Sequence, residues 1–245
     1  MSYEIVTCDC FFLGCGRCNI ELAYLVDSST KTDQDAWTQM LNYVSSSVQG
    51  YTIRSDCVRA AVIRYGNSAD APIQLNSYSN ADDLAVAIGR IEFLGGGSNL
   101  AAALDLLRSQ VFASNMVRSN AVKIAIVITD QLQSSSQITT AANSVKSDDI
   151  TIVGVAITAP GRSVDTSFFG TLVSSRDCLI QVSNYDRLVR EARGRVVTDC
   201  ACLEYVAPPT TTTPAAPAPS PSPRMYTLHS PCIQQFRRLG LYFTS

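Results

Sequence analysis

The chain has 245 residues, of which 46% are hydrophobic and 16% charged, and its formal net charge is −2. This length is enough for one sizeable core, and the slightly acidic balance argues against a nucleic-acid partner. No stretch approaches the roughly 18 apolar residues of a membrane-spanning helix, so no membrane span is expected. The single histidine, His229, lies near the end of the chain, which argues against a catalytic triad in the folded part.

Composition divides the chain into four parts. They are a cysteine-dense lead (1–18), a domain with periodic apolar patterns (19–203), a Pro/Thr/Ser-rich linker (204–223) and a short tail (224–245). The linker cannot bury a core, so we expect it to be extended and without regular structure. The start of the chain lacks a basic region followed by a long apolar run, so no signal peptide is expected within it.

Strands and helices alternate along the domain. Apolar runs and turn signals predict strands at residues 20–27, 58–66, 71–76, 122–130, 150–157 and 178–182. Apolar residues at helical spacing predict helices at residues 37–48, 80–91, 98–112, 137–148 and 184–197.

The strand pattern predicts the class of fold. Almost continuously apolar strands that alternate with helices are typical of a parallel sheet covered on both faces. Residues 71–76 follow the preceding strand too closely for a crossover helix, so we expect them to pair antiparallel at the edge, where Pro72 is tolerated. The expected fold is therefore a doubly wound α/β domain with a mostly parallel six-stranded sheet and helices on both faces. Such domains bind ligands beyond the carboxyl ends of their strands.

Polar residues gather at these strand ends. Asp27 ends the first strand and Ser29 follows it, Ser98 follows the glycines 95–97, and Asp130 ends the strand at 122–130. Carboxylate and hydroxyl oxygens are ligands for a hard divalent cation such as Mg²⁺ or Mn²⁺. The residues alone leave other roles open. The two serines could cap the helices that follow, and Asp130 could be a turn residue. Asp27 could be a phosphoryl-accepting nucleophile.

The order of these three loops resembles the von Willebrand factor type A domain, the module of collagen VI, matrilins and integrin I domains. That family carries a metal ion-dependent adhesion site (MIDAS), built from an Asp-x-Ser-x-Ser loop, a Gly-Gly-x-Thr type loop and an aspartate after the fourth strand. The corresponding stretches here are "DSSTK" (27–31), "GGGSNL" (95–100) and "ITDQ" (128–131). The resemblance covers about residues 19–200.

The resemblance implies a secreted adhesion or matrix-assembly module rather than an enzyme, with a protein partner such as collagen. It implies metal ligands at Asp27, Ser29, Ser98 and Asp130, and a ligand-binding face that includes Lys31, Gly97 and Gln131. Two alternatives remain, a Mg²⁺-dependent enzyme of the doubly wound class and an intracellular scaffold with the same fold.

Four positions depart from the family pattern. Ser98 replaces a threonine but keeps its hydroxyl, Gln131 replaces a glycine, and Leu100 stands where a second threonine often occurs. Lys31 replaces the second serine of the first loop. An ammonium group offers donors and no acceptor, so it cannot coordinate a cation. Either Lys31 points outward and four protein oxygens remain, or its ammonium pairs with an aspartate in place of the metal.

The nine cysteines favour an oxidising compartment. They are Cys8, Cys10, Cys15, Cys18, Cys57, Cys178, Cys200, Cys202 and Cys232. We expect Cys18, Cys57 and Cys178 at the amino edge of the sheet, because each shortly precedes a strand. The lead could hold disulfides or zinc. Cys232, beyond the linker, is a candidate for a disulfide-linked oligomer.

Overall fold

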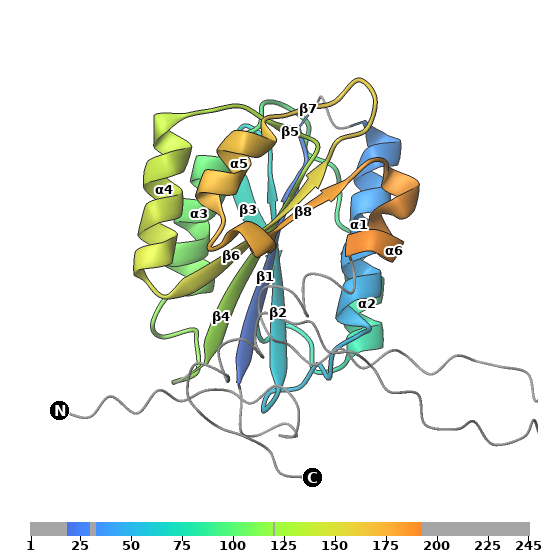
Figure 1. Ribbon diagram of the computed structural model, residues 1–245. Helices are drawn as coiled ribbons and strands as arrows, with labels where there is room; N and C mark the ends of the chain where they lie inside the picture. Colours follow the sequence, from blue (N-terminus) through green and yellow to red (C-terminus); the bar gives the residue numbers. More distant parts are fainter. Residues whose placement is uncertain (1–18, 30–32, 120, 193–245) are drawn as a thin grey trace, which may run out of the picture. The chain divides into compact units, whose positions relative to one another are not determined.

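The computed structural model describes residues 19–29, 33–119 and 121–192. At their centre lies a six-stranded sheet in the order β3-β2-β1-β4-β6-β8 (Figure 1). Its strands are β1 (Ile20–Asp27), β2 (Val58–Tyr65), β3 (Ala69–Ile73), β4 (Val122–Thr129), β6 (Ile150–Ile157) and β8 (Leu179–Val182). All neighbours pair in parallel except β3, which is antiparallel to β2. The predicted doubly wound fold is confirmed.

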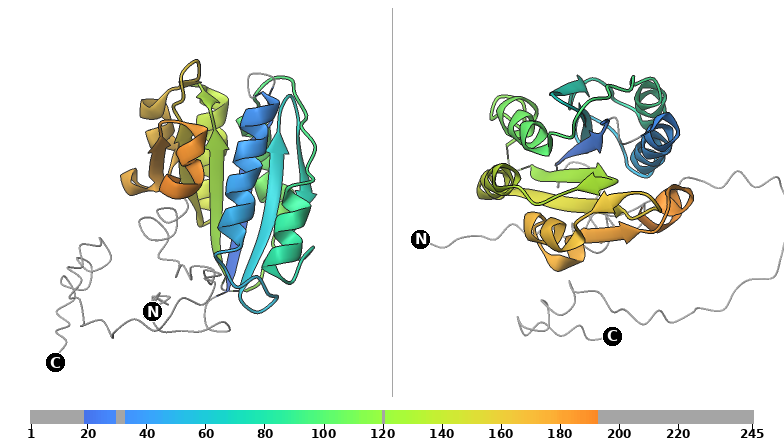
Figure 2. Two further views of the ribbon diagram at one scale, coloured as in Figure 1. Left: turned by 90° about the vertical axis from the view of Figure 1, so that its right-hand side faces the viewer. Right: turned by 90° about the horizontal axis from the view of Figure 1, so that it is seen from above.

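Helices cover both faces of the sheet (Figure 2). One face carries α1 (Gln34–Val48), α2 (Ala81–Ile88) and α6 (Leu188–Ala192). The other carries α3 (Leu100–Leu106), which continues as a π-helical turn (Leu107–Val111), together with α4 (Ser136–Ser147) and α5 (Thr166–Leu172). Strand β1 shows why the strands are apolar throughout. Tyr24 packs toward the first group of helices and Leu25 toward the second, and both are fully buried.

The helices that follow the first strand and the glycine loop have caps other than the predicted serines. The Asp33 side chain accepts a hydrogen bond from Ala36 N (2.8 Å) at the start of α1. Asn99 accepts one from Ala102 N (3.1 Å) at the start of α3. The capping role considered for Ser29 and Ser98 is therefore wrong, and their hydroxyls serve the site described below.

Several short elements were not predicted. A two-stranded sheet joins β5 (Gln131–Leu132) to β7 (Ser163–Val164), and α5 is a helix of seven residues. A short 3₁₀ turn at Arg176–Cys178 precedes β8, and another at Tyr185–Arg187 precedes α6. Elements this short carry too few residues for a periodic pattern. None of the helices in the described residues has both the length and the apolar character needed to cross a membrane.

The predicted position at the amino edge is confirmed for Cys57 and wrong for Cys178, while Cys18 lies outside the described residues. Cys57 directly precedes β2, and its carbonyl accepts a hydrogen bond from Ile20 N (3.1 Å) at the amino edge. Leu179 is in register with Gly154, the fifth residue of β6, so Cys178 lies about halfway along that strand. Both cysteines are disulfide-bonded. The remaining seven lie outside the described residues, as do the lead, the linker and the tail.

A buried ionic cluster closes the amino edge of the sheet. Glu21 of β1 is fully buried, and its carboxylate accepts hydrogen bonds from Arg59 Nε (2.9 Å), Arg118 Nε (2.9 Å) and Arg118 N (3.0 Å). The Arg118 guanidinium also donates to the carbonyls of Ile20 and Cys57, which ties β1 to the segment before β2. Burial acts to raise the pKa of Glu21, but the two arginines outweigh it and hold the pKa below its ordinary value.

Glu21→Gln is expected to lower the free energy of unfolding at pH 7 by about 3 kcal/mol, because it leaves two arginines near the core without their carboxylate. A lowered pKa means that the stabilisation is present above the ordinary value of 4.5 and is lost as the pH falls through the folded-state pKa. Urea unfolding at pH 7 and at lower pH measures both effects. Asp56→Asn, which removes an exposed pair with Arg54, should change little. An equal loss in the two variants would contradict the prediction.

Candidate metal and ligand-binding site

Asp27 forms the centre of the site at the carboxyl edge of the sheet. It ends β1 in register with Tyr65 and is fully buried. One carboxylate oxygen accepts a hydrogen bond from Ser29 N (3.0 Å). The other lies 2.9 Å from Ser98 Oγ and 2.8 Å from Thr129 Oγ1. Three separate segments of the chain therefore converge on one carboxylate.

Within the described residues, the hydrogen-bond donors to this carboxylate are all neutral. Burial raises the pKa of Asp27, and the hydrogen bonds from Ser29, Thr129 and Ser98 offset that effect in part. No basic side chain of the described residues forms an ion pair with it. A buried carboxylate in this state costs stability when it is ionised, so the position is suited to a cation.

Ser28 and Asn67 hold the glycine loop against the first loop. Ser28 is fully buried, its Oγ accepts a hydrogen bond from Leu94 N (2.7 Å), and its carbonyl accepts one from Gly95 N (2.8 Å). The Asn67 side chain accepts a hydrogen bond from Gly97 N (2.6 Å). These contacts position the Ser98 hydroxyl over Asp27. Ser28 and Asn67 were not predicted as site residues, since neither stands at a ligand position of the family motif.

Gln131 closes another side of the site. Its side-chain amide donates to Ser29 Oγ, and its backbone N–H donates to Thr129 Oγ1 (3.1 Å). The residue that replaces the family glycine therefore contacts a predicted metal ligand directly. Gly97 and Gln131, two residues of the expected ligand-binding face, both line the groove above the site. Lys31 lies outside the described residues.

Asp130 lies at the same edge but has a different environment. It is fully buried, and its carboxylate lies 3.2 Å from Arg162 Nε and accepts a hydrogen bond from the Tyr185 hydroxyl (2.5 Å). Arg162 also pairs with Asp33 (2.6 Å). Burial and the adjacent carboxylate raise the pKa of Tyr185 well above its ordinary value, so its hydroxyl stays protonated. Arg162 was not predicted as a site residue, although "APGR" (159–162) is a recognisable turn signal.

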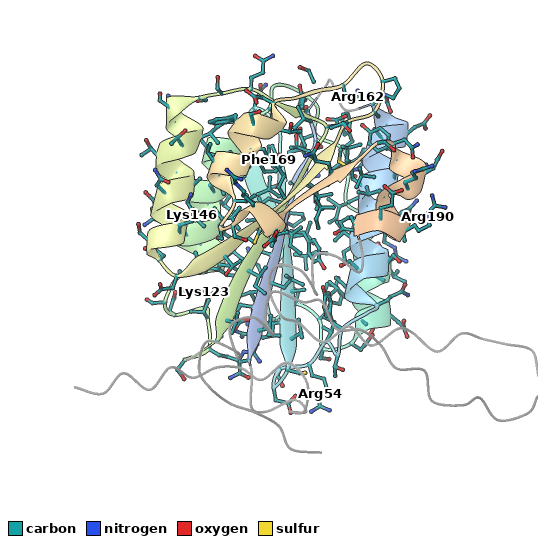
Figure 3. All side chains as sticks on the ribbon, in the orientation of Figure 1. Arg54, Lys123, Lys146, Arg162, Phe169 and Arg190 are labelled. Atoms are coloured by element: carbon teal, nitrogen blue, oxygen red, sulfur yellow. The ribbon has the colours of Figure 1, made fainter. Side chains whose placement is uncertain are left out.

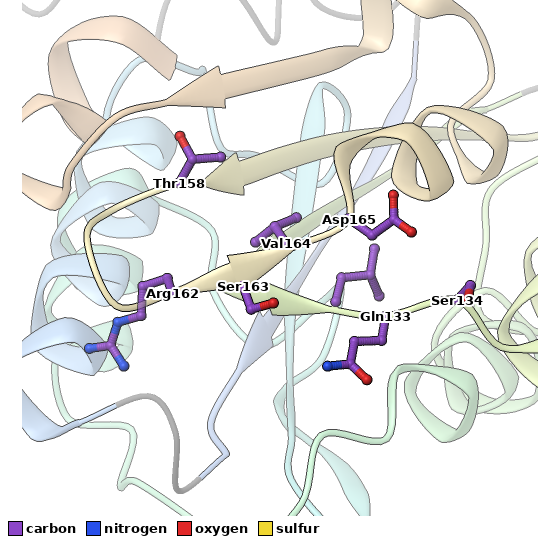
Figure 4. A pocket seen from close by; sticks show the side chains of 8 residues that line it. Gln133, Ser134, Thr158, Arg162, Ser163, Val164 and Asp165 are labelled. Carbon is purple, nitrogen blue, oxygen red and sulfur yellow. The ribbon is translucent and has the colours of Figure 1, made fainter.

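Two hollows open beside these residues. A groove of about 1020 Å³ is lined by Ser29, Ser98, Asp130 and Gln131 together with the starts of α3 and α4. A smaller pocket of about 510 Å³ lies between residues 132–134 and residues 158–165 (Figure 4). Arg162 lines both, and it lies at the carboxyl edge of the sheet, opposite Arg54 at the amino edge (Figure 3).

The donor set fits a hard divalent cation on the Asp27 side. Carboxylate and hydroxyl oxygens from Asp27, Ser29 and Ser98 meet there, and these are suitable ligands for such an ion. The described residues contain no cluster of three or more His, Cys, Asp or Glu side chains that would hold a metal, so any site depends on the hydroxyls. On the Asp130 side, a guanidinium and a phenol already engage the carboxylate.

Known proteins match most of the described chain. The von Willebrand factor type A domain family matches residues 21–193. The human collagen alpha-6(VI) chain is 26% identical over 191 residues, which are 76% of this chain and 8% of that protein. Mouse matrilin-3 is 28% identical over 124 residues, which are 48% of this chain and 26% of that protein. The chain thus spans a small part of these relatives.

Solved structures share the fold. Proximal thread matrix protein 1 from the mussel byssus, with a zinc-occupied MIDAS motif, has a TM-score of 0.67 at 16% identity over 76% of this chain and 48% of its own. The manganese-loaded TRAP protein of Plasmodium vivax has a TM-score of 0.60 at 17% identity over 75% of each chain. At these identities the likeness bears on the fold alone.

Gly66→Ala tests the packing that positions Ser98. A Cβ at this residue would lie 2.3 Å from Gly95 O, so the glycine loop must move. We expect a loss of about 2 kcal/mol in the free energy of unfolding, as in other overpacked sites. Gly89→Ala is the control, because the nearest atom would lie at 3.7 Å, an ordinary contact. Chemical denaturation of both variants measures the difference, and an undisturbed Gly66→Ala protein would contradict the geometry.

Proposed function

Because the chain belongs to the von Willebrand factor type A domain family, we propose that it is a secreted adhesion or matrix-assembly module. Its ligand-binding face is the carboxyl edge of the sheet. The observation that carries this proposal is the convergence of Ser29, Ser98 and Thr129 on the buried Asp27 carboxylate beneath an open groove. The printed names of the relatives, a collagen VI chain and matrilin-3, support a matrix protein such as collagen as partner. They favour adhesion over a Mg²⁺-dependent enzyme or an intracellular scaffold.

The face would hold a divalent cation, Mg²⁺ or Mn²⁺, through Asp27, Ser29 and Ser98, with Asp130 on the far side. The zinc- and manganese-containing structures that share the fold support a cation of this class. A bound cation would supply positive charge for an acidic side chain of the partner. Asp27 would balance that charge, while Gly97 and Gln131 would form the rim that contacts the partner.

Two parts of the proposal rest on the sequence alone. Lys31 stands in the first loop in place of a serine ligand, and its ammonium would either compete with the cation or pair with carboxylates of the partner. Cys232 would link two chains through a disulfide.

Asp27→Asn tests the site through stability. In EDTA at pH 7 the variant is expected to be about 1 kcal/mol more stable than the wild type, because an amide replaces a buried carboxylate that has no ion-pair partner in the described chain. Added Mn²⁺ should raise the melting temperature of the wild type but not of the variant. Thermal unfolding with and without Mn²⁺ measures both effects. Equal responses to Mn²⁺ would refute Asp27 as a ligand.

Titration of Mg²⁺ or Mn²⁺ into the wild type and into Lys31→Ser tests the role of the lysine. We expect the variant to bind the cation more tightly, since serine restores an oxygen ligand and the replacement removes a positive charge.

Retention on immobilised collagen or whole matrix, with and without EDTA, tests the adhesive function. EDTA-sensitive retention that Asp27→Asn abolishes is the expected result. Turnover of a phosphoester by the chain would overturn the adhesion proposal in favour of an enzyme.

A further inference from the structure

Arg162 connects four segments of the chain at the carboxyl edge of the sheet. Its Nε lies 3.2 Å from Asp130, which follows β4, and its Nη2 lies 2.6 Å from Asp33, the cap of α1. The guanidinium also lies over the ring of Tyr185, with its carbon 5.7 Å from the centroid. The Tyr185 hydroxyl donates to Asp130 in turn. Arg162 and Tyr185 thus engage the same carboxylate from the turn after β6 and from the turn before α6.

The backbone holds Arg162 in this place. Residues 159–162 form a turn closed by a hydrogen bond from Arg162 N to Ala159 O (3.0 Å). Pro160 occupies its second position, and Gly161 occupies its third with a φ of +79°. A type II turn favours these residues, because proline presets its own φ at the second position and glycine tolerates the positive φ of the third. The Arg162 side chain is only 17% exposed. A rigid turn therefore presents a fixed cation rather than a mobile surface arginine.

The two carboxylates of the candidate metal site, Asp27 and Asp130, therefore differ in their ion pairing. Both are fully buried, yet only Asp130 forms an ion pair within the described chain. A guanidinium and a divalent cation that share one buried carboxylate repel each other, and the carboxylate cannot serve both fully. Arg162 and Tyr185 both contact Oδ2 of Asp130, so ligation through that oxygen requires Arg162 to give up its contact, and charge repulsion opposes ligation through the other oxygen.

We propose that Arg162 is a resident cation of the site, which neutralises Asp130 in the metal-free protein and competes with a divalent cation for that carboxylate. The inference rests on the proposed metal-dependent function and adds its regulation. In the metal-free protein Arg162 ties Asp130 to Asp33 at the start of α1. When it withdraws, Asp130 becomes available and the pairing with Asp33 remains to hold the guanidinium.

The test compares the full chain with Arg162→Gln and with Arg108→Gln. Both variants lose one positive charge, but Arg108 pairs with Asp148 on the surface (2.7 Å), away from the groove. Mn²⁺ binding is measured by calorimetry and by electron paramagnetic resonance, and folding in EDTA is checked by thermal unfolding. Arg162→Gln is expected to bind Mn²⁺ about tenfold more tightly than the wild type, which corresponds to the loss of one charged contact. Arg108→Gln should bind like the wild type.

Two further variants show whether the increase in Mn²⁺ affinity depends on Asp130. Arg162→Lys keeps the charge but loses the fork that spans two carboxylates, so its Mn²⁺ affinity should lie between those of the wild type and Arg162→Gln. It also carries the test if Arg162→Gln fails to fold. In the Asp130→Asn background, Arg162→Gln should bring no further gain, because the contested carboxylate is gone.

The outcomes separate this inference from the function on which it rests. If the wild type binds Mn²⁺ and Arg162→Gln binds it equally well, the competition is refuted and the metal site stands. If Arg162→Gln still increases the Mn²⁺ affinity in the Asp130→Asn background, the increase is a general charge effect and the inference is overturned. If neither the wild type nor Arg162→Gln binds Mn²⁺, the metal proposal and the inference fail together.

Discussion

The parallel register of β1 with β2 and β4 is the constraint on which the site depends. Asp27 pairs with Tyr65 on one side, and Val26 pairs with Ile128 on the other, so the three strands end at the same level. Their following loops must then meet at one edge. The short reach of a hydroxyl from Thr129 to Asp27 follows directly from that register. A slip of one residue would turn each side chain to the opposite face and disperse the site.

Strand β1 carries a fully buried carboxylate near each end, and the two have different environments. Glu21 at the amino edge lies against two arginines, which lower its pKa and make it a structural ion pair. Asp27 at the carboxyl edge receives hydroxyl and backbone donors, and its pKa is raised. Within one strand, arginines of the fold neutralise the first carboxylate, whereas no basic side chain of the described residues pairs with the second. This contrast is a physical reason to locate function at the carboxyl edge.

Asp130 gives the carboxyl edge its asymmetry. Its partners, Arg162 and Tyr185, come from turns that lie far along the chain, and they connect the start of α1 with the start of α6. The ring of Tyr185 and the carboxylates of Asp33 and Asp130 surround the guanidinium. The two aspartates at this edge thus differ in charge balance. Asp130 faces a guanidinium, whereas Asp27 faces hydroxyl and backbone donors in the described residues.

The sequence by itself determined the order of the six strands of the main sheet and of the helices α1, α2, α3, α4 and α6. It also determined the antiparallel edge strand and the candidate ligands Asp27, Ser29, Ser98 and Asp130. Apolar periodicity and the ends of strands are local features of the sequence, so they can be predicted without knowledge of the tertiary contacts. Only the tertiary structure decided that Asp33 and Asn99, rather than the serines, cap the helices. It also decided which aspartate pairs with Arg162. That ion pair joins residues 32 positions apart, and it depends on where the turn at 159–162 directs the arginine side chain.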